Sequence, residues 1–589
     1  MSDETQPGQP DCPLRRIGVY VCHCGGNISD HVDVEKVKET LAEEAEVVLS
    51  ETSLFACSDG TQHDMIREIQ EQNLDGLVVA SCSPKLHLFT FRGVAKRAGL
   101  NPFQYTQVNI REQDSWAHSD DPEGATEKAI GLVRAGVAKT RLSSPLEPLV
   151  VETTPKTMVI GAGIAGLRAA IGLADIGLGV YLVEREPEVG GWVGKFGAMY
   201  PNERDGHALV EHLLAEVKKR PSIVLLTNAE LVAKSGSFGN YVAEVHVHGS
   251  NGDAPQVINA EVGAIVVATG FDTYRPDEGE FGYGIDGVLT LPEFKELVDA
   301  SDGPLVHAGR PVRSIAYVYC VGSRQPGGNE HCSRYCCAAT VHASIEVAKL
   351  DPSIHQYHLY RDIRTYGKYE LMYTESRERG SVYMKFPDDK PPAVSRTPEG
   401  QLLVTTTDTL TGPDELAIPA DLVVLVTGMV ARDNDGLISA LKLPVGGDGF
   451  FNEIHPKLRP VETVVDGVMI CGACQGPKNS SESVASALAA VTQSGTLLKQ
   501  GVAELDPLVA IVNHDACTLC GMCLETCPYG AIEKVQSDGG EVIEISAAMC
   551  KGCGGCAPVC LEDAIDLLGS TDDQIRAMID SLVPEVTAA

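Results

Sequence analysis

The chain has 589 residues, 43% hydrophobic and 22% charged, so it is long enough for several hydrophobic cores and has the composition of a globular protein. Its formal net charge of −34 repels phosphate backbones and anionic lipid, which argues against nucleic acid as a partner. The opening residues MSDETQPGQPD are acidic where a secretory signal would be basic, and no apolar run reaches the roughly 18 to 20 residues of a membrane span. We therefore expect a cytoplasmic protein with no direct membrane span, whose 19 cysteines serve metals or redox chemistry.

Four cysteines near the N-terminus follow segments with the composition of strands. Cys22 and Cys24 end the apolar run that begins at Arg16, and Cys57 and Cys82 end or follow later strand-like segments. We expect these strand ends to bring the four thiols together at one site. Zinc or buried free thiols are the alternatives. The neighbouring His23 and His87 are not expected to bind the metal.

A dinucleotide-binding unit is predicted from residue 157 onward. An apolar strand leads into Gly161-x-Gly163-x-x-Gly166 and then into an Ala-rich helix. These glycines allow the tight turn, the approach of backbone amides to a pyrophosphate, and close packing of helix on strand. The next strand ends at Glu184, about 20 residues on, where a carboxylate can accept the ribose hydroxyls.

The residues after Glu184 favour FAD over NAD. Gly190-Gly191-Trp192 resembles the second glycine motif of two-dinucleotide flavoproteins related to thioredoxin reductase. Two strands end in Thr269-Gly270 and Thr427-Gly428, and they resemble the motifs of that family at which the chain passes from one lobe to the other. The segment between them is therefore expected to form an inserted lobe. The family's closing aspartate is replaced by Ala473, although the helix from residue 483 to 490 can still direct its N-terminus at a flavin. The residues expected to contact FAD are Gly161, Gly163, Ile164, Ala165, Gly166, Glu184, Arg185, Gly191, Trp192, Thr269, Gly270, Gly428, Gly472 and Gln475.

The inserted lobe contains cysteines where related reductases have a nucleotide-binding glycine motif. Cys320 ends a strand, and Cys332, Cys336 and Cys337 precede or begin an Ala-rich helix. Four thiols between a strand and a helix N-terminus can bind one 4Fe–4S cubane. The alternative is a redox thiol pair, because thiols at a helix start can have lowered pKa values. With a cluster in this position, electrons would reach the flavin through iron–sulfur centres and not from a bound nicotinamide.

Two cysteine runs near the C-terminus are typical of bacterial ferredoxins. Each has the spacing Cys-x2-Cys-x2-Cys-x3-Cys, and the fourth cysteine of such a run binds the cluster of the other run. We therefore assign one cluster to Cys517, Cys520, Cys523 and Cys560, and the other to Cys550, Cys553, Cys556 and Cys527. Zinc is the alternative, but it does not account for a duplicated four-cysteine run. Cys560 is followed by Leu561 where Cys527 is followed by proline, so its last turn can differ in shape.

Several motifs together resemble the flavin-containing A-subunit of the heterodisulfide reductases, over residues 16 to about 568. They are Cys22-His-Cys24-Gly, the stretch from Asn109 to His118, Cys332-Ser-Arg-Tyr-Cys336-Cys337, the stretch from Tyr360 to Glu370, and Gln475-Gly-Pro-Lys478. The resemblance implies one FAD and four 4Fe–4S clusters. It also implies that Lys368 and Lys478 lie near the isoalloxazine ring, where a cation would stabilise the reduced, anionic flavin.

The family role implied by this resemblance is to split an electron pair between ferredoxin and a disulfide-reducing partner. The implied partners are a B subunit with Cys-Cys-Gly motifs, an iron–sulfur C subunit, ferredoxin, and a hydrogenase or formate dehydrogenase that supplies electrons, assembled as a dimer of heteromers. Cys336-Cys337 occurs once and is followed by Ala338, so disulfide cleavage is expected on another chain. An additional ferredoxin module found in some members is missing from the turn 235–240, which contains no cysteine.

Two other functions remain open at this stage. One is an electron-transfer subunit of a quinone-linked or sulfur-metabolism complex without bifurcation, and the other is a scaffold that only relays electrons. Cys12, Cys471 and Cys474 have no predicted role.

The expected fold is α/β, with a thioredoxin-reductase-like two-lobed FAD domain between two cluster-binding domains. The predicted boundaries are an N-terminal α/β domain at 1–148, the FAD domain at 149–505 with its inserted lobe at about 271–429, a bacterial-type ferredoxin domain at 506–570, and a tail at 571–589.

Overall fold

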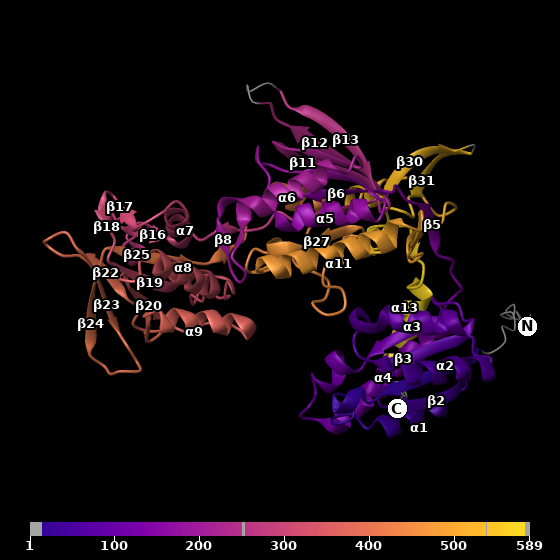
Figure 1. The fold of residues 1–589 in the computed structure, drawn as a ribbon. Helices are drawn as coiled ribbons and strands as arrows, with labels where there is room; N and C mark the ends of the chain where they lie inside the picture. The colour runs from indigo at the N-terminus through magenta and orange to yellow at the C-terminus, as the bar shows by residue number, and fades with distance from the viewer. Residues whose placement is uncertain (1–14, 250–253, 538, 584–589) are drawn as a thin grey trace, which may run out of the picture. The chain divides into compact units, whose positions relative to one another are not determined.

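The computed structural model describes residues 15–249, 254–537 and 539–583 (Figure 1). The chain divides into two compact units, one formed by Met1–Val150 with Glu504–Ala589 and the other by Val151–Ala503. The first and last predicted domains therefore belong to one unit, and the FAD domain with its inserted lobe forms the other. Among the described residues, no helix combines the length and the apolar character that crossing a membrane requires.

The N-terminal part of the first unit is a parallel four-stranded sheet in the order β2-β1-β3-β4. The residues of β1 and β3 are all buried, as expected for central strands with helices on both faces. The parallel strands place the chain after β1, β2 and β3 at one edge of the sheet. The elements are β1 (Ile17–Cys22), α1 (Val34–Ala42), β2 (Val47–Ser53), α2 (Asp59–Glu71), β3 (Gly76–Ser81), α3 (Pro84–Ala98), β4 (Tyr105–Asn109) and α4 (Pro122–Arg141), with η1 (Cys24–Gly26) and η2 (Arg111–Ser115) between them.

The C-terminal part of the first unit consists of two short antiparallel ribbons around the ferredoxin-type cysteines. One pairs β29 (Ala510–Val512) with β32 (Ile565–Leu567), and the other pairs β30 (Ile532–Ser537) with β31 (Gly540–Ile545). The short helix α12 (Met522–Thr526) lies between the first ribbon's opening strand and β30.

The segment expected to be a tail contains a helix, α13 (Asp572–Leu582). Thr571 and Gln574 form a capping box at its start. It packs against α4, where the Gln574 amide donates to the Lys139 carbonyl at 3.4 Å and the Lys139 ammonium donates to Ser570 Oγ at 3.1 Å. The C-terminal segment is thus part of the first unit's packing.

The FAD lobe of the second unit has a parallel sheet in the order β10-β7-β6-β14-β27. Helices α5 and α11 lie side by side against it (Figure 1), and a three-stranded antiparallel sheet packs on its other side. The elements are β5 (Leu149–Glu152), β6 (Lys156–Ile160), α5 (Ile164–Asp175), β7 (Gly179–Val183), η3 (Val193–Lys195), β8 (Ala198–Met199), β9 (Arg204–Asp205), α6 (Gly206–Lys218), β10 (Ile223–Leu226), β11 (Ala229–Ser237), β12 (Asn240–Val247), β13 (Gln256–Val262), β14 (Ala264–Val267), α10 (Asp435–Leu441), β27 (Val468–Ile470), η6 (Gly472–Gln475), α11 (Ser480–Leu498) and β28 (Val502–Leu505).

The inserted lobe repeats this plan. Its parallel sheet has the order β16-β25-β19-β20-β21, and an antiparallel sheet of β22, β23 and β24 packs on one side. The two crossings between lobes, β15 and β26, pair with each other immediately after the Thr-Gly sequences that predicted them. The elements are β15 (Asp272–Thr273), η4 (Glu280–Gly282), β16 (Val288–Thr290), α7 (Leu291–Asp299), β17 (Val306–His307), β18 (Arg310–Pro311), β19 (Ser314–Val321), α8 (Cys336–Leu350), β20 (His355–Tyr360), η5 (Gly367–Tyr369), α9 (Glu370–Glu378), β21 (Val382–Lys385), β22 (Ala393–Arg396), β23 (Leu402–Thr407), β24 (Glu415–Ala420), β25 (Leu422–Thr427) and β26 (Met429–Val430).

Candidate cofactor sites

The glycine motif forms the turn from β6 into α5. Gly161 has a left-handed φ of +99°, and a methyl group there would lie 2.5 Å from the Ala268 carbonyl oxygen. A methyl group on Gly166 would lie 1.8 Å from the Gly161 carbonyl oxygen, so this helix can approach its strand only with glycine at that position. Gly163 is the N-cap of α5, and nothing lies within 4 Å of its missing side chain. The backbone amides at the helix start are therefore open to an anionic ligand.

The carboxylate of Glu184 lies at the end of β7 beside this turn. Its side chain is 8% exposed and accepts hydrogen bonds from the backbone amides of Ala162 at 2.6 Å and Glu186 at 3.0 Å. Each oxygen accepts one of these bonds and has a second lone pair available. Glu184 can thus hold the glycine turn and still accept a ribose hydroxyl.

A cavity of about 870 Å³ extends from the glycine motif to the inserted lobe. Its size lies within the range of about 300–1,000 Å³ that is usual for small-molecule and cofactor sites. The predicted residues that line it are Gly161, Gly163, Ile164, Ala165, Glu184, Arg185, Gly191, Trp192, Thr269, Gly270 and Lys478. The donor set fits FAD, because it offers a helix N-terminus to a pyrophosphate, a carboxylate to a ribose and an apolar wall to a ring system.

Several predicted residues support this cavity without lining it. A methyl group on Gly472 would lie 2.8 Å from Ala165 Cβ, and one on Gly428 would lie 2.5 Å from Ser333 Oγ, so both positions serve close packing. Gly166 likewise belongs to the packing of α5. Gln475 is directed elsewhere, because its amide donates to Glu453 at 2.6 Å and to the Pro460 carbonyl at 2.7 Å.

The two predicted lysines have different surroundings. Lys478 lines the cavity, and its ammonium donates to Gln475 Oε1 at 3.1 Å. Burial lowers the pKa of Lys478, while nearby Cys474 and Glu453 oppose that shift. Lys368 is exposed on η5 and does not contribute to the cavity wall, although its neighbour Tyr369 does. A position of Lys368 beside a flavin ring therefore stays a prediction.

Aromatic side chains contribute to the cavity wall, and of these only Trp192 was predicted. The Trp192 indole donates to the Phe271 carbonyl at 3.0 Å and stacks on the Phe271 ring at 6.0 Å. Tyr200 meets Tyr369 edge-on at 5.4 Å, and Tyr335 also lines the cavity. Tyr335 and Tyr369 lie inside sequence motifs that were singled out for other reasons, next to Cys336 and Lys368.

The N-terminal sheet brings its four cysteines to one edge. Cys22 Sγ accepts hydrogen bonds from the backbone amides of Cys24 at 3.2 Å and Ala56 at 3.3 Å. The Arg111 guanidinium donates to Cys24 Sγ at 3.2 Å, and it also counteracts the burial that raises the pKa of Cys82 to about 11. Burial raises the pKa of the Cys57 thiol, and nearby Cys24 adds to this shift. The site thus supplies four thiols and one cation that would favour their ionised form.

Both neighbouring histidines have polar side chains beside them. The His23 ring lies 3.9 Å from Glu35, and the His87 ring faces Thr90 Oγ1 at 3.4 Å.

The four cysteines of the inserted lobe also come together, at the carboxyl end of β19 and the start of α8. Cys320 is buried with a left-handed φ of +63°, and Cys336 and Cys337 are the first two residues of α8. Burial raises the pKa of Cys320 to about 11, against the opposing effect of nearby arginines. The Cys336 thiol donates to Cys337, which lowers the pKa of Cys337.

In this structure, these thiols are spaced more widely than the ligands of one zinc ion. One zinc with Zn–S bonds of about 2.3 Å would hold its sulfur ligands about 3.8 Å apart. Within residues 15–249, 254–537 and 539–583, no three thiols lie within 4.8 Å of one another. A cubane binds its thiolates to four separate irons and so holds them farther apart.

The ferredoxin-type cysteines line two separate cavities. One is bordered by Cys517, Cys520, Cys523 and Cys560, and the other by Cys527, Cys550, Cys553 and Cys556. Each set combines three cysteines of one run with the fourth of the other, as the sequence assignment requires. The backbone amides of Ala531 and Ala564 donate to Cys527 Sγ at 3.4 Å and Cys560 Sγ at 3.3 Å. The two runs therefore end in similar turns despite Leu561.

Cys471 and Cys474 do not form a redox pair in this structure. Both are buried, but Cys471 belongs to the core on the helix side of the FAD-lobe sheet and Cys474 to the core on its other side. The Cys474 thiol donates to the carbonyls of Val267 at 3.4 Å and Cys471 at 3.1 Å. Cys12 lies outside the described residues.

Comparisons with known protein families agree with this arrangement of sites. Residues 157–195 match the model of an FAD binding domain, and residues 516–564 match that of a 4Fe-4S dicluster domain. Among solved structures, a thioredoxin reductase from T. acidophilum aligns with 58% of this chain and 97% of its own length, with 14% identity and a TM-score of 0.40.

Curated relatives align over most of the chain. The A2 iron-sulfur subunit of the CoB--CoM heterodisulfide reductase of Methanopyrus kandleri is 37% identical over 89% of this chain and 92% of its own length. The A-subunit of the H(2):CoB-CoM heterodisulfide,ferredoxin reductase of Methanothermobacter thermautotrophicus is 35% identical over 88% and 90%. A protein of Archaeoglobus profundus described as similar to the heterodisulfide reductase A-subunit is 32% identical over 88% and 91%. The chain therefore belongs to the heterodisulfide reductase A-subunit family, as an oxidoreductase subunit that carries FAD and iron–sulfur clusters.

Proposed function

We propose that this subunit receives electrons from a hydrogenase or formate dehydrogenase and divides electron pairs between ferredoxin and a disulfide-reducing partner. The observation that carries the proposal is the position of the cysteines of the inserted lobe beside the flavin cavity. Tyr335 lines that cavity and directly precedes Cys336, and the cavity also borders Ala339 on the same helix. A cluster bound at the start of α8 would thus adjoin the flavin, where a related reductase would hold a nicotinamide.

The proposed cofactor content is one FAD and four 4Fe–4S clusters. Four groups of four thiols support it: the N-terminal group, the group in the inserted lobe and the two ferredoxin-type groups. FAD would exchange either one or two electrons when bound, so it can connect one-electron clusters with a two-electron donor. The chain's residues would bind its pyrophosphate at the start of α5, its ribose at Glu184 and its ring system near Lys478.

The proposed partners follow from the names of the relatives and from the chemistry that this chain lacks. One relative is named for H2 and another for H2 or formate as donor, and both names include the CoB-CoM heterodisulfide and ferredoxin. We assign disulfide cleavage to a B subunit with Cys-Cys-Gly motifs, linked through an iron–sulfur C subunit, in a cytoplasmic dimer of heteromers. Cys336-Cys337 is followed by Ala338, so this chain has no such motif at that point.

An anaerobic purification of the whole complex tests this function. The purified complex is supplied with H2 or formate, and ferredoxin reduction and disulfide reduction are measured together. We expect each acceptor to be reduced only when the other is present, in equal numbers of electron pairs. Reduction of one acceptor alone at the full rate would refute electron splitting. Co-purification with cytochrome-containing subunits would instead favour a quinone-linked complex without bifurcation.

A further inference from the structure

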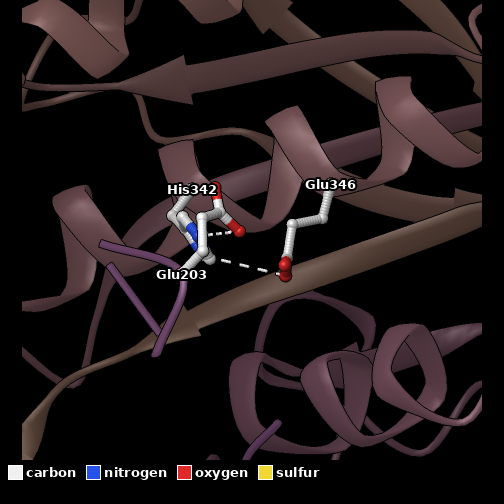
Figure 2. A group of neighbouring side chains, drawn as sticks. All are labelled: Glu203, His342 and Glu346. Atoms are coloured by element: carbon white, nitrogen blue, oxygen red, sulfur yellow. Dashed lines mark ion pairs between the residues drawn. The ribbon is translucent and has the colours of Figure 1, made fainter. Parts of the chain in front are cut away.

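A buried histidine in the inserted lobe lies close to two carboxylates (Figure 2). His342 on α8 is 3% exposed. Its Nε2 lies 3.4 Å from Glu203 Oε2, and its Nδ1 lies 3.7 Å from Glu346 Oε2. Neither the sequence motifs nor the cofactor sites described above account for this group.

The charges around this group argue against a metal ion. A ligand atom from each of Glu203, His342 and Glu346 lies within 4.8 Å of the other two, so distance alone would allow one. However, each carboxylate has an ammonium partner. Lys349 Nζ lies 2.9 Å from Glu203 Oε1, and Lys295 Nζ lies 3.0 Å from Glu346 Oε2. These lysines already balance the charge that would attract a cation.

The group connects the protein surface with the flavin cavity. Glu203 is exposed on the turn between β8 and β9, whereas His342, Lys295 and Tyr200 line the cavity. His342 is therefore a buried group that lies close to a solvent-exposed acid and also lines the cofactor cavity.

Burial favours the neutral form of the His342 imidazole. The groups that face it are Glu203 from the β8–β9 turn, Glu346 and Lys349 on α8, and Lys295 with its partner Asp299 on α7, while the Tyr200 ring lies 6.5 Å away. Burial lowers the pKa of His342, and Lys295 adds to this shift while Glu346 and Glu203 oppose it. A neutral imidazole has one donor and one acceptor nitrogen, so it can take up a proton at one and release a proton from the other.

We propose that His342 carries protons from Glu203 at the surface to the flavin cavity. This inference rests on the proposed function, because it requires FAD in the cavity and reduction by clusters. Two-electron reduction of a flavin takes up two electrons and one proton, and iron–sulfur clusters supply electrons alone. In each cycle the O–H bond of protonated Glu203 breaks as an N–H bond forms on His342, and an N–H bond of His342 then breaks as the proton enters the cavity. Solvent reprotonates Glu203, and rotation of the His342 ring restores its starting tautomer, so both side chains return to their starting state.

The experiment follows proton uptake separately from electron transfer. The full chain with FAD and its clusters is photoreduced anaerobically in weak buffer, with a pH-indicator dye to follow protons and flavin absorbance to follow electrons. This reduction needs no partner subunit, so it is independent of electron splitting. The variants are His342→Gln, Glu203→Gln and the control His355→Gln, which changes an exposed histidine of the same lobe outside the cavity wall.

We expect His342→Gln to slow proton uptake on the order of 100-fold, the usual size of an acid–base contribution. Glu203→Gln should slow it less, because water can replace an exposed acid, and His355→Gln should not change it. Added imidazole should restore uptake in His342→Ala, and the pH dependence of the rate should disappear in His342→Gln.

Wild-type proton uptake in His342→Gln would overturn the proposal. If His342→Gln fails to fold or to bind FAD, Glu203→Gln decides alone, because an unchanged rate in that exposed-site variant would equally refute the path. A wild-type chain that binds no FAD would refute the proposed function itself, which distinguishes that failure from failure of the proton path.

Discussion

Replacing Gly166 by alanine tests the flavin site most sharply, because the structure predicts different outcomes at two glycines of one motif. The added methyl group would lie 1.8 Å from the Gly161 carbonyl oxygen, which is backbone and cannot rotate away. The start of α5 must therefore move, at a cost of about 1–3 kcal/mol for overpacking a close contact. If FAD binding has to restore the original geometry, that cost weakens binding by roughly 5- to 150-fold, since each 1.4 kcal/mol is a factor of ten.

The matched variant is Gly163→Ala, whose methyl group would have no protein atom within 4 Å. It should change the stability of the FAD-free chain less than Gly166→Ala does, and it should weaken FAD binding, because the methyl group would occupy space that the pyrophosphate needs. Gly166→Ala should lower both. Denaturant unfolding of the FAD-free chain and titration with FAD by flavin fluorescence measure the two quantities. Equal stability of the two variants would refute the packing argument, and normal FAD binding by Gly163→Ala would refute the placement of the pyrophosphate.

Three further predictions concern the other sites. Asp114 is fully buried, and desolvation raises its pKa to about 6. The folded chain therefore binds more protons than the unfolded chain between pH about 4 and 6, and its stability falls as the pH rises through that window. Asp114→Asn should raise the free energy of unfolding by on the order of 2 kcal/mol at pH 8 and by less at pH 5. A gain independent of pH in denaturant titrations would contradict this. Lys478→Gln should lower the flavin midpoint potential in a spectroelectrochemical titration, because it removes a cation from the cavity. Lys368 is exposed, so Lys368→Gln should change the potential less. A larger effect of Lys368→Gln would place that residue at the ring instead. Cys332→Ser should remove about four irons per chain, and Cys474→Ala should remove none. Iron analysis that finds the same iron content in both variants would show that the inserted lobe holds no cluster.

The features that could be predicted from the sequence are those whose chemistry depends on local spacing. The turn at Gly161 and the two ferredoxin-type runs are formed by residues close in sequence, so their spacing alone restricts what they can bind. The two crossings between lobes could also be predicted from the sequence, because each follows a buried strand that ends in Thr-Gly.

The remaining features depend on contacts between distant segments. Phe271 and Tyr200 enter the cavity wall only because the inserted lobe folds back toward the glycine motif, and no periodicity near either residue indicates this. His342 reads as an ordinary residue of an Ala-rich helix until Glu203, 139 positions earlier, comes within 3.4 Å of it. Helix α13 was missed in a different way. Its capping residues Thr571 and Gln574 are visible in the sequence, but its packing against α4 is not.

Iron, zinc and FAD analysis of the anaerobically purified chain tests the central claim most directly. Four clusters and one flavin predict about sixteen iron atoms and one FAD per chain, without stoichiometric zinc. About eight irons, confined to the ferredoxin-type runs, or zinc bound by Cys320, Cys332, Cys336 and Cys337, would contradict the view that a cluster adjoins the flavin in place of a nicotinamide.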